Sequence, residues 1–595
     1  MPLSYHFERA ALCRLSIEIQ SASPDSVAAW LLVAARRLAG SLKFRNLVPQ
    51  GNGVEEDEDT DDVVEDEEEC EQRGSFELPC FESATAVSLN LGFLGLSLPA
   101  AGVCSRLTKL SLSRVRFEGP WELGDAISSP RCPFLTKLSV RYSEGLTNLT
   151  INSRSLLRVN LRGLRGLRRL AIEAPALGCL IVSHCFYFGH DQPVVSISAP
   201  QLEWLQWLDS YDPSSMYLDT MERIDRLAPF FFIVYGDEES ITNNHSCVRL
   251  LQHFKVIETL ILSLLYPEGL DNCSYLMDDM TMLPDITNLH LIVVANGHAF
   301  GASIFHVLRM CSGIKMLDLK LNIQQGNEDD EEGREQRGSF ELPCFESATA
   351  VSLDLGFLGL SVPAAGVFSR LTNLCLSRIR FEGPWELGDA ISSPRCPFLT
   401  KLSVRDSKGL TILTINSRSL RCLNLRGLLG LRRLAIEAPA LACLTVAQCF
   451  YFGHDQPVVS ISAPQLERLQ WLDSYDPTSM HLDIMERIVR LVPFFFIVYG
   501  GQDSITNNHS CLRLLQHFKV IETLVLSLLY LEGLDNCSYL MDDMTMLPEI
   551  RDLQLIVMAN GHAFGASTFH VLRKCSGIRM LHLKLDMAEV KSSFV

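Results

Sequence analysis

Leucine and other branched apolar residues recur along the chain in the short pattern Leu-x-x-Leu-x-Leu. Examples are LTKLSL (Leu107–Leu112), LTKLSV (Leu135–Val140) and VIETLIL (Val256–Leu262). The alternation places the leucines on one side of a short strand and the polar residues on the other. Most centres lie 21 to 29 residues apart, the spacing of leucine-rich repeats. The pattern predicts an α/β leucine-rich-repeat solenoid, a horseshoe with a parallel concave sheet and a convex side of mixed helices and strands.

The segments between these strands differ in length, and their patterns predict different connections. Short intervals contain a second apolar strand, and longer ones contain amphipathic helices. We expect convex strands at Leu146–Ile151, Leu167–Ile172 and Val194–Pro200, and helices at Ser26–Gly40, Asn244–Phe254 and Gly301–Cys311. Ser23 or Asp25 would cap the first helix, and Asn244 or Ser246 the second. The longest interval, between Leu205 and Leu260, is predicted to contain a helix near Met216–Leu227 and to comprise two irregular repeats.

The repeats belong to a longer unit that occurs twice. Glu71–Asn322 aligns without a gap to Glu335–Asp586, with 39 differences in 252 positions. We therefore divide the chain into N-terminal repeats and cap (1–49), an acidic disordered loop (50–73), a first module (74–325), an acidic linker (326–337) and a second module (338–595). The modules could stack end to end in one arc, or form two horseshoes joined by a hinge.

Charge and composition narrow the possible functions. The net charge is −18, but 13 acidic residues lie in Glu55–Glu71 and six in Glu328–Glu335, so the remainder is close to neutral. This balance argues against nonspecific nucleic-acid binding. No apolar stretch is long enough for a membrane span, and no signal peptide begins the sequence, so we expect the cytoplasm or nucleus. The 19 cysteines form no CxxC pair and are expected to be free thiols.

The sequence contains no catalytic signature. The patterns of a serine nucleophile elbow and of phosphate-binding loops do not occur, and cysteine and histidine are not clustered at zinc-ligand spacing. We therefore predict neither enzyme activity nor a cofactor or metal.

The polar positions of the predicted concave sheet are the best candidates for binding a partner. In the first module they carry basic or amide side chains on neighbouring strands, which would form a basic ladder for an acidic segment, unless they are only the solvated face of the sheet. The candidate residues are Lys109, Lys137, Arg141, Arg158, Asn160, Arg162 and, as an aromatic anchor, Trp204, together with Lys401, Arg405 and Arg426 in the second module. We also hypothesise that the acidic segment Glu55–Glu71 folds back and masks this ladder.

Several longer sequence segments resemble those of a known protein family. Phe76–Val103, Phe117–Val140, Tyr275–Ser303 and Phe305–Leu321 closely resemble plant, and especially grass, F-box/leucine-rich-repeat proteins, some of which carry a C-terminal FBD segment. The resemblance implies a substrate receptor of an SCF-type ubiquitin ligase, whose F-box binds a Skp-type adaptor and whose repeats hold a target protein. No part of this sequence matches the F-box or FBD segments, so we expect the adaptor as a partner only if an F-box lies upstream. A scaffold or decoy with no ligase link, or a truncated gene product, are the alternatives. The target itself is not indicated.

Overall fold

The computed structural model divides the chain into two compact units. Unit 1 comprises Met1–His290 and Ala302–Ser312, and unit 2 comprises Leu291–Gly301 and Gly313–Val595. The residues that the structure describes are 12–47, 74–99, 102–118, 122–186, 192–219, 222–269, 273–280, 283–296, 298, 300–311, 313–322, 339–341, 347–361, 367–381, 386–428, 430–450, 456–531 and 537–586. Both predicted acidic segments, 50–73 and 326–337, lie outside these residues.

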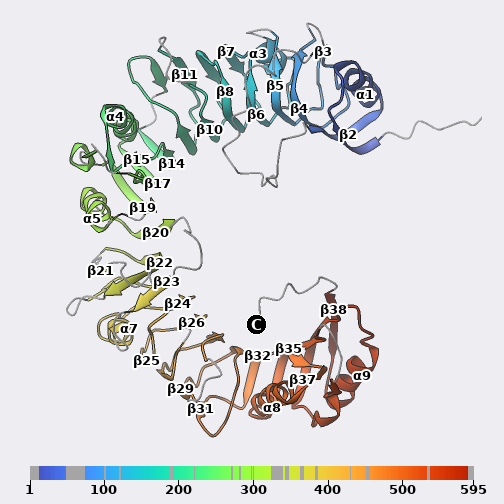
Figure 1. Cartoon of the computed structure of the whole chain (residues 1–595), viewed down its shortest axis with the longest axis vertical. Coiled ribbons are helices and arrows are strands. Elements are labelled where there is room, and N and C mark those ends of the chain that lie inside the picture. Colours follow the sequence, from blue (N-terminus) through green and yellow to red (C-terminus); the bar gives the residue numbers. More distant parts are fainter. Residues whose placement is uncertain are drawn as a thin grey trace, which may run out of the picture. The chain divides into compact units, whose positions relative to one another are not determined.

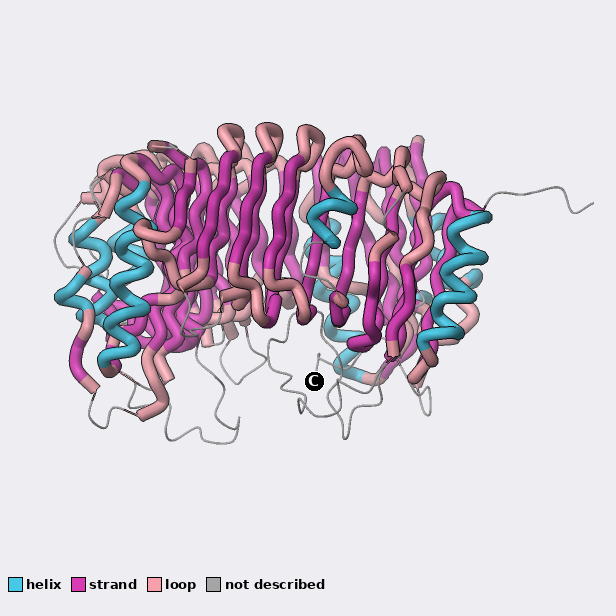
Figure 2. Tube along the Cα trace, turned by 90° about the horizontal axis from the view of Figure 1, so that it is seen from above, coloured by secondary structure: helices cyan, strands magenta, loops and turns pink. Residues whose placement is uncertain are grey.

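Unit 1 is built on a long parallel sheet, which we call its main sheet (Figures 1 and 2). Strand follows strand in chain order: β1 (Leu12–Gln20), β2 (Leu38–Leu47), β4 (Ala86–Ser97), β5 (Lys109–Phe117), β6 (Lys137–Glu144), β8 (Arg158–Arg165), β10 (Cys179–Ser183), β12 (Trp204–Leu208), β14 (Arg223–Pro229) and β17 (Val256–Leu265). The short strands β3 (Ser75–Glu77) and β15 (Phe232–Ile233) pair with β4 and β17. The strands predicted from the leucine pattern are therefore confirmed.

A second parallel sheet lies behind part of the first. It consists of β7 (Asn148–Asn152), β9 (Arg169–Glu173), β11 (Val194–Ser198) and β13 (Met216–Leu218). The inward side chains of both sheets are buried and form the core, as shown by Leu138 and Val140 on β6 and Leu149 and Ile151 on β7. The predicted convex strands are confirmed. We call the opposite side of the main sheet, which carries the polar residues between those leucines, the open face.

Side-chain hydrogen bonds at the start of the strands keep successive repeats in register. The Thr108 Oγ1 hydroxyl donates to the carbonyl oxygen of Thr85 at 2.8 Å, and the Thr136 hydroxyl to that of Thr108 at 2.9 Å. The short helix α3 (Glu122–Ile127) lies against β7, where a Cβ at Gly124 would sit 2.3 Å from the carbonyl oxygen of Thr150. Glycine permits this close approach because it has no side chain.

The helices of unit 1 lie in the longer connections and agree only partly with prediction. Besides α3, they are α1 (Pro24–Arg37), α4 (Glu238–His253) and α5 (Gly301–Met310), and α5 starts where predicted. Ser23 caps α1 as expected, because its hydroxyl accepts from the Ser26 N–H at 3.4 Å. The cap of α4 is Asp237, so the prediction of Asn244 or Ser246 was wrong.

Asn244 and Ser246 instead connect α4 to neighbouring segments. The buried Asn244 side chain accepts from the Ile233 N–H at 2.8 Å and donates to the Ile233 carbonyl at 2.7 Å. The Ser246 hydroxyl accepts from the backbone N–H of Tyr211 at 2.5 Å. The predicted helix near Met216–Leu227 is also wrong, because this segment contains strands β13 and β14. The interval between Leu205 and Leu260 does hold two repeats, since β14 pairs with both β12 and β17.

Smaller elements complete the end of unit 1. β16 (Tyr235–Gly236) pairs antiparallel with β18 (Ser274–Tyr275), and the 3-10 helix η1 (Met277–Asp279) follows. The boundary between the units falls within β19 (Asp285–Val294).

Unit 2 has the same two-layer plan. Its main sheet contains β20 (Met316–Asn322), β22 (Ala350–Ser361), β23 (Asn373–Phe381), β24 (Lys401–Arg405), β26 (Cys422–Arg426), β28 (Cys443–Ala447), β30 (Arg468–Leu472), β32 (Arg487–Pro493), β35 (Val520–Leu529), β37 (Glu549–Met558) and β38 (Met580–Asp586). β20, from the end of the first sequence copy, thus pairs with β22 at the start of the second.

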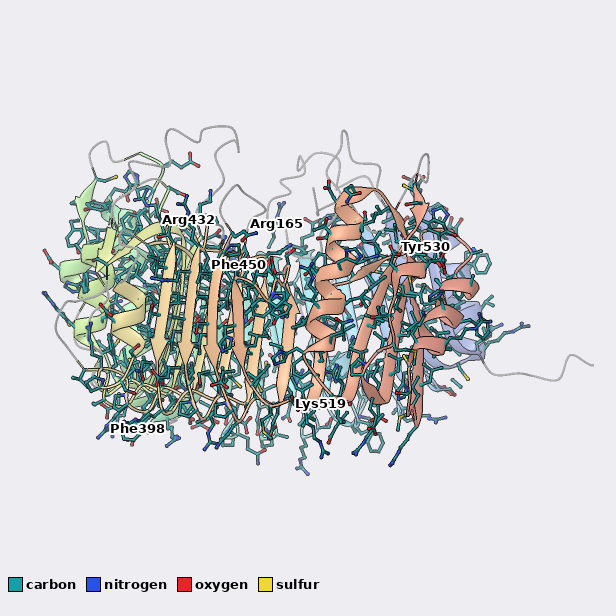
Figure 3. The ribbon with its side chains drawn as sticks, turned by 90° about the horizontal axis from the view of Figure 1, so that it is seen from below. Arg165, Phe398, Arg432, Phe450, Lys519 and Tyr530 are labelled. Atoms are coloured by element: carbon teal, nitrogen blue, oxygen red, sulfur yellow. The ribbon has the colours of Figure 1, made fainter. Side chains whose placement is uncertain are left out.

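The remaining elements of unit 2 repeat those of unit 1. The second sheet contains β25 (Ile412–Asn416), β27 (Arg433–Glu437), β29 (Val458–Ser462) and β31 (Met480–Asp483). The helices are α7 (Glu386–Ile391), α8 (Gln502–Gln516), α9 (Gly565–Lys574) and the 3-10 helix η2 (Met541–Asp543); the short strands are β21 (Ser339–Glu341), β33 (Phe496–Ile497), β34 (Tyr499–Gly500) and β36 (Ser538–Tyr539). Among the side chains labelled in Figure 3, Phe450 stacks on Trp471 in the core, and Lys519, just before β35, pairs with Glu486 at 2.5 Å.

Candidate functional site

The register of the main sheet in unit 1 brings the predicted basic residues together on the open face. Lys109, Lys137 and Arg158 are directly opposite one another on β5, β6 and β8. Arg141 and Arg162 form a second pair four residues farther along β6 and β8. Neighbouring strands are ~4.8 Å apart, so these five cations occupy a compact area. The structure therefore places the sequence-predicted residues of the first module on one surface.

Asn160 lies between the two basic rows. It is opposite Ser139 on β6 and Ile181 on β10. Its side-chain oxygen Oδ1 is buried and accepts no hydrogen bond, and the Nε atoms of Arg141 and Arg162 likewise have no partner. Leaving a buried polar atom unpaired costs about 1–3 kcal/mol. This part of the open face thus presents two donors and one acceptor whose hydrogen bonds are not satisfied within the described chain.

Trp204 continues the first basic row on β12. It follows Arg158 and Cys179 in register, and Arg226 on β14 lies opposite it. The Arg226 guanidinium carbon is 4.8 Å from the centre of the Trp204 ring, a cation–π contact. The indole Nε1 of Trp204 is buried without a hydrogen-bond acceptor. Sequence reasoning missed Arg226 because it assigned this segment to a helix, although RLAP follows the same apolar alternation as the neighbouring strands.

The equivalent surface of unit 2 carries Lys401, Arg405 and Arg426, as predicted. Arg405 and Arg426 are opposite each other on β24 and β26, while Lys401 is flanked by Asn373 and Cys422, where unit 1 has Lys109 and Arg158. Arg468 takes the position of Trp204 and is opposite Arg490. The structure places these residues on one surface, but the row that contains Lys401 has fewer basic residues than the row of Lys109, Lys137 and Arg158 in unit 1.

The polar groups of unit 2 bond to one another. The Ser403 hydroxyl is contacted by Arg405 Nε at 3.0 Å and by Asn424 Nδ2 at 3.3 Å, and Asn424 Oδ1 accepts from Arg426 Nε at 3.1 Å. The same four residue types occur in unit 1 without these bonds. The neighbours differ: Thr445 is opposite Asn424, whereas the apolar Ile181 is opposite Asn160. The two open faces are therefore alike in sequence and different in hydrogen bonding.

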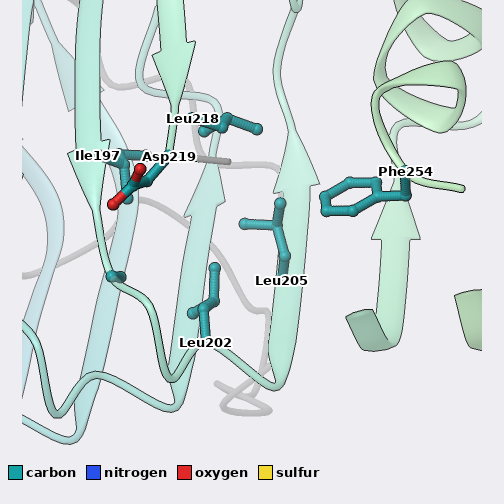
Figure 4. Close-up of a pocket in the computed structure, with 7 residues that line it drawn as sticks. Ile197, Leu202, Leu205, Leu218, Asp219 and Phe254 are labelled. Atoms are coloured by element: carbon teal, nitrogen blue, oxygen red, sulfur yellow. The ribbon is translucent and has the colours of Figure 1, made fainter. Parts of the chain in front are cut away.

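Unit 1 also contains two largely apolar spaces. The first, of about 260 Å³ including open solvent, is lined by apolar side chains and by Asp219, which accepts from the Ser198 hydroxyl at 3.0 Å (Figure 4). The second, of about 560 Å³ including open solvent, lies beside α3 and is lined by Cys80, Cys104, Cys132, Arg131 and apolar residues. Neither gathers the convergent polar groups of a typical ligand pocket.

The larger space has a counterpart in unit 2 of about 300 Å³, where the buried Phe368 occupies the position of Cys104. We expect Cys104→Phe to raise the stability of unit 1 by about 1–2 kcal/mol, because burying apolar surface contributes ~25 cal/mol per Å². The reciprocal Phe368→Cys should lower the stability of unit 2 by more, about 2–4 kcal/mol, since it opens a cavity. Hydrogen–deuterium exchange of peptides from β5 and β23 measures both, because it reports on each unit separately; faster exchange in β5 with Cys104→Phe would mean that the space cannot accept a ring.

Other sequence-predicted features give no site. Among the described residues, no group of three or more histidine, cysteine and acidic side chains could hold a metal ion, and the described cysteines are free thiols. Over the same residues, no helix combines the length and apolar character of a membrane span. The hypothesis that Glu55–Glu71 masks the ladder concerns residues outside those described.

A comparison with known families identifies the repeats. The chain matches the family described as FBD-associated F-box protein At5g56370, LRR repeats, at residues 62–222 and again at 333–490, together more than half of its length. The chain belongs to this family of plant F-box proteins with leucine-rich repeats. The two matches fall on the two sequence copies, in agreement with a duplicated repeat region.

A curated member of the F-box family is similar over a shorter range. An F-box/FBD/LRR-repeat protein of Arabidopsis thaliana is 33% identical over 160 residues, which is 27% of this chain and 32% of the relative. The match thus spans about a third of the relative. Among solved structures, a TLR13–ssRNA13 complex aligns over 84% of this chain and 85% of its own at 12% identity, with a TM-score of 0.29, too low to support an inference about this chain.

Proposed function

We propose that this chain recognises a target protein through the open face of the main sheet of unit 1, as the substrate-binding part of an SCF-type ubiquitin ligase receptor. Membership of the F-box/LRR family supports the ligase connection. The observation that carries the binding role is the row of Lys109, Lys137 and Arg158, set in register on rigid strands. The repeating backbone already fixes the spacing of the three residues, so this backbone does not have to become ordered on binding, which favours recognition.

Under this proposal the chain does no chemistry itself. It holds the target, and a ubiquitin-conjugating enzyme brought to the same complex performs the transfer. The gain is one of proximity, because a bound target is present at a high effective concentration. We place this activity in the cytoplasm or nucleus, with no cofactor. An F-box, the segment named in the Arabidopsis relative, would contact the Skp-type adaptor.

Proximity labelling in plant cells tests the proposal. We would fuse a biotin ligase to the intact chain and compare it with Lys109→Glu/Lys137→Glu/Arg158→Glu. We expect a set of proteins to be labelled by the unchanged chain and lost with the variant, because reversed charges repel the same surface. The matched control is Lys401→Glu/Arg405→Glu/Arg426→Glu, which reverses the same number of charges on the open face of unit 2, with circular dichroism to verify folding.

The same experiment separates the ligase role from the alternatives. Skp-type and cullin proteins among the labelled partners, with targets that accumulate when the proteasome is inhibited, would support a receptor. Labelled targets without either ligase component would indicate a scaffold or decoy. An identical set of partners for the chain and the triple variant would contradict binding through this face.

A further inference from the structure

We infer that the open face of unit 1, but not that of unit 2, holds an extended acidic peptide segment of the target. The inference rests on the proposed function and specifies the chemical class of its ligand. It depends on three differences between surfaces that share most of their sequence. These differences concern charge, unsatisfied hydrogen bonds and the side chain at the end of the first row.

The first difference is charge. On β4, β5, β6, β8 and β10, the open-face positions from Ala86 to Ser183 in the three registered rows hold five cations and no acidic residue. The corresponding positions in unit 2 hold three cations and one carboxylate. That carboxylate, Asp354 in place of Asn90, already receives two bonds from Arg378, with Nε–Oδ1 of 2.7 Å and Nη2–Oδ2 of 2.8 Å. Beyond the rows, Arg165 is opposite Glu144 (Figure 3 labels Arg165).

The second difference is hydrogen bonding. In unit 1, Arg141 Nε and Arg162 Nε are buried donors without an acceptor, and Asn160 Oδ1 is a buried acceptor without a donor. A peptide strand offers both missing partners: side-chain carboxylates for the two arginines and a backbone N–H for the asparagine. In unit 2, Ser403 and Asn424 already occupy the equivalent arginine Nε atoms. A ligand there would have to break bonds that the chain makes itself.

The third difference is the side chain at the end of the first row, which determines how far apart the acidic and apolar residues of the peptide lie. Trp204 lies two strands from Arg158, a distance of ~10 Å, which an extended peptide crosses in about three residues. The ring of Trp204, which is half-buried, can contact an apolar side chain of the peptide. Unit 2 presents Arg468 opposite Arg490 at this point instead. The fitting segment therefore has an acidic residue followed, about three residues away, by an apolar one.

A peptide is favoured over nucleic acid as the anionic ligand. The basic residues of the open face occupy three short rows, which a short acidic segment can cover and a long polyanion would extend beyond. The Asn160 acceptor also requires a donor, and a peptide strand brings a backbone N–H at each residue other than proline, whereas the phosphate groups that carry the charge of a nucleic acid bring none.

Fluorescence anisotropy with the full chain tests the inference. The probe is a labelled twelve-residue Ser/Gly peptide carrying Glu residues and one Phe three positions from the nearest Glu. Its partner has Gln in place of every Glu. We expect the Glu peptide to bind more tightly, and binding to weaken as salt is raised from about 50 to 300 mM. Arg141→Gln/Arg162→Gln should weaken binding by on the order of tenfold, while the matched Arg405→Gln/Arg426→Gln should change it less than about twofold.

Each other outcome overturns the inference. Equal losses in the two double variants would show that the units do not differ as ligand sites. Equal affinity for the Gln peptide would exclude recognition of carboxylates. Binding of single-stranded oligouridylate in place of the peptide, with the same dependence on Arg141 and Arg162, would assign the face to nucleic acid. If none of these probes binds while proximity labelling still depends on Lys109, Lys137 and Arg158, the proposed function stands and the acidic ligand class falls.

Discussion

Leu319→Ala on β20 should destabilise unit 2 by about 2–5 kcal/mol, whereas Leu583→Ala at the equivalent position of β38 should cost less than about 1 kcal/mol. The two leucines occupy the same place in the two sequence copies. Leu319 is fully buried and opposite Leu353 on β22, but Leu583 is 47% exposed, because β38 pairs with β37 and no described strand follows it. The difference between the two losses of stability measures what a neighbouring repeat contributes by burying the strand beside it.

Hydrogen–deuterium exchange is the suitable measurement, because long repeat arrays do not unfold in a single two-state step. Peptides from β20 and β38 can be told apart, since MLDLKLN differs from MLHLKLD at two positions. We expect Leu319→Ala to accelerate exchange in β20 and β22, and Leu583→Ala to leave β37 almost unchanged. Equal effects at both positions would mean that β38 is covered in solution.

The strand positions could be predicted because apolar residues alternate with polar ones within each strand, and the same pattern returns in every repeat. Leu110 and Leu112, for example, recur as Leu138 and Val140 one repeat later, and all four are buried. The same alternation determines which polar residues share the open face, and Lys137 and Arg158 lie opposite each other there. Binding of a partner by this surface stays a prediction.

The errors arose where tertiary contacts override local pattern. Met216, Ile224 and Leu227 have spacing compatible with a helix, yet stacking against β11 and β12 makes this segment two strands. Asn244 looks like a helix cap from its residue type, but its side chain bonds Ile233 from within the helix. Local sequence carries no information about that partner, which is 11 residues away.

The difference between the two open faces could not have been predicted at all. Arg141, Asn160 and Arg162 have identical counterparts in unit 2, so no residue type announces that only one set is internally bonded. That property depends on side-chain conformations, and through them on neighbours such as Ile181 or Thr445. Duplication makes it visible, because each unit serves as a reference for the other.

The buried carboxyl groups of Asp209 and Asp473 should make stability fall as pH rises from about 4 to 7. Asp209 accepts from the backbone N–H groups of Cys185 at 3.0 Å and Phe186 at 3.1 Å, and burial raises its pKa from 3.8 to about 7. Asp473 makes the same contacts to Cys449 and Phe450, and burial raises its pKa to about 7 as well. The folded state keeps protons on these groups that the unfolded state has released.

The direction in which stability changes with pH follows from this difference in bound protons. The stabilising contribution is complete below pH 3.8 and is lost as pH rises through 7, at ~1.4 kcal/mol per pH unit and up to about 4 kcal/mol for each site. Asparagine does not titrate, so the stability of the wild type relative to Asp209→Asn/Asp473→Asn isolates the effect from all other groups. The urea midpoint followed by tryptophan fluorescence, compared between the two proteins at several pH values, gives the sign and the pH range of this difference.

Asp212 provides a control, because its pKa is shifted in the opposite direction to that of Asp209. Backbone and side-chain hydrogen bonds from Ser214 lower the pKa of the exposed Asp212, so any contribution it makes is present above pH 3.8 and lost as the pH falls further. Asp212→Asn should therefore leave the slope between pH 4 and 7 intact. If the wild type and Asp209→Asn/Asp473→Asn lose stability in parallel over that range, these carboxyl groups are ionised in the folded chain, and their N–H bonds outweigh the cost of burial.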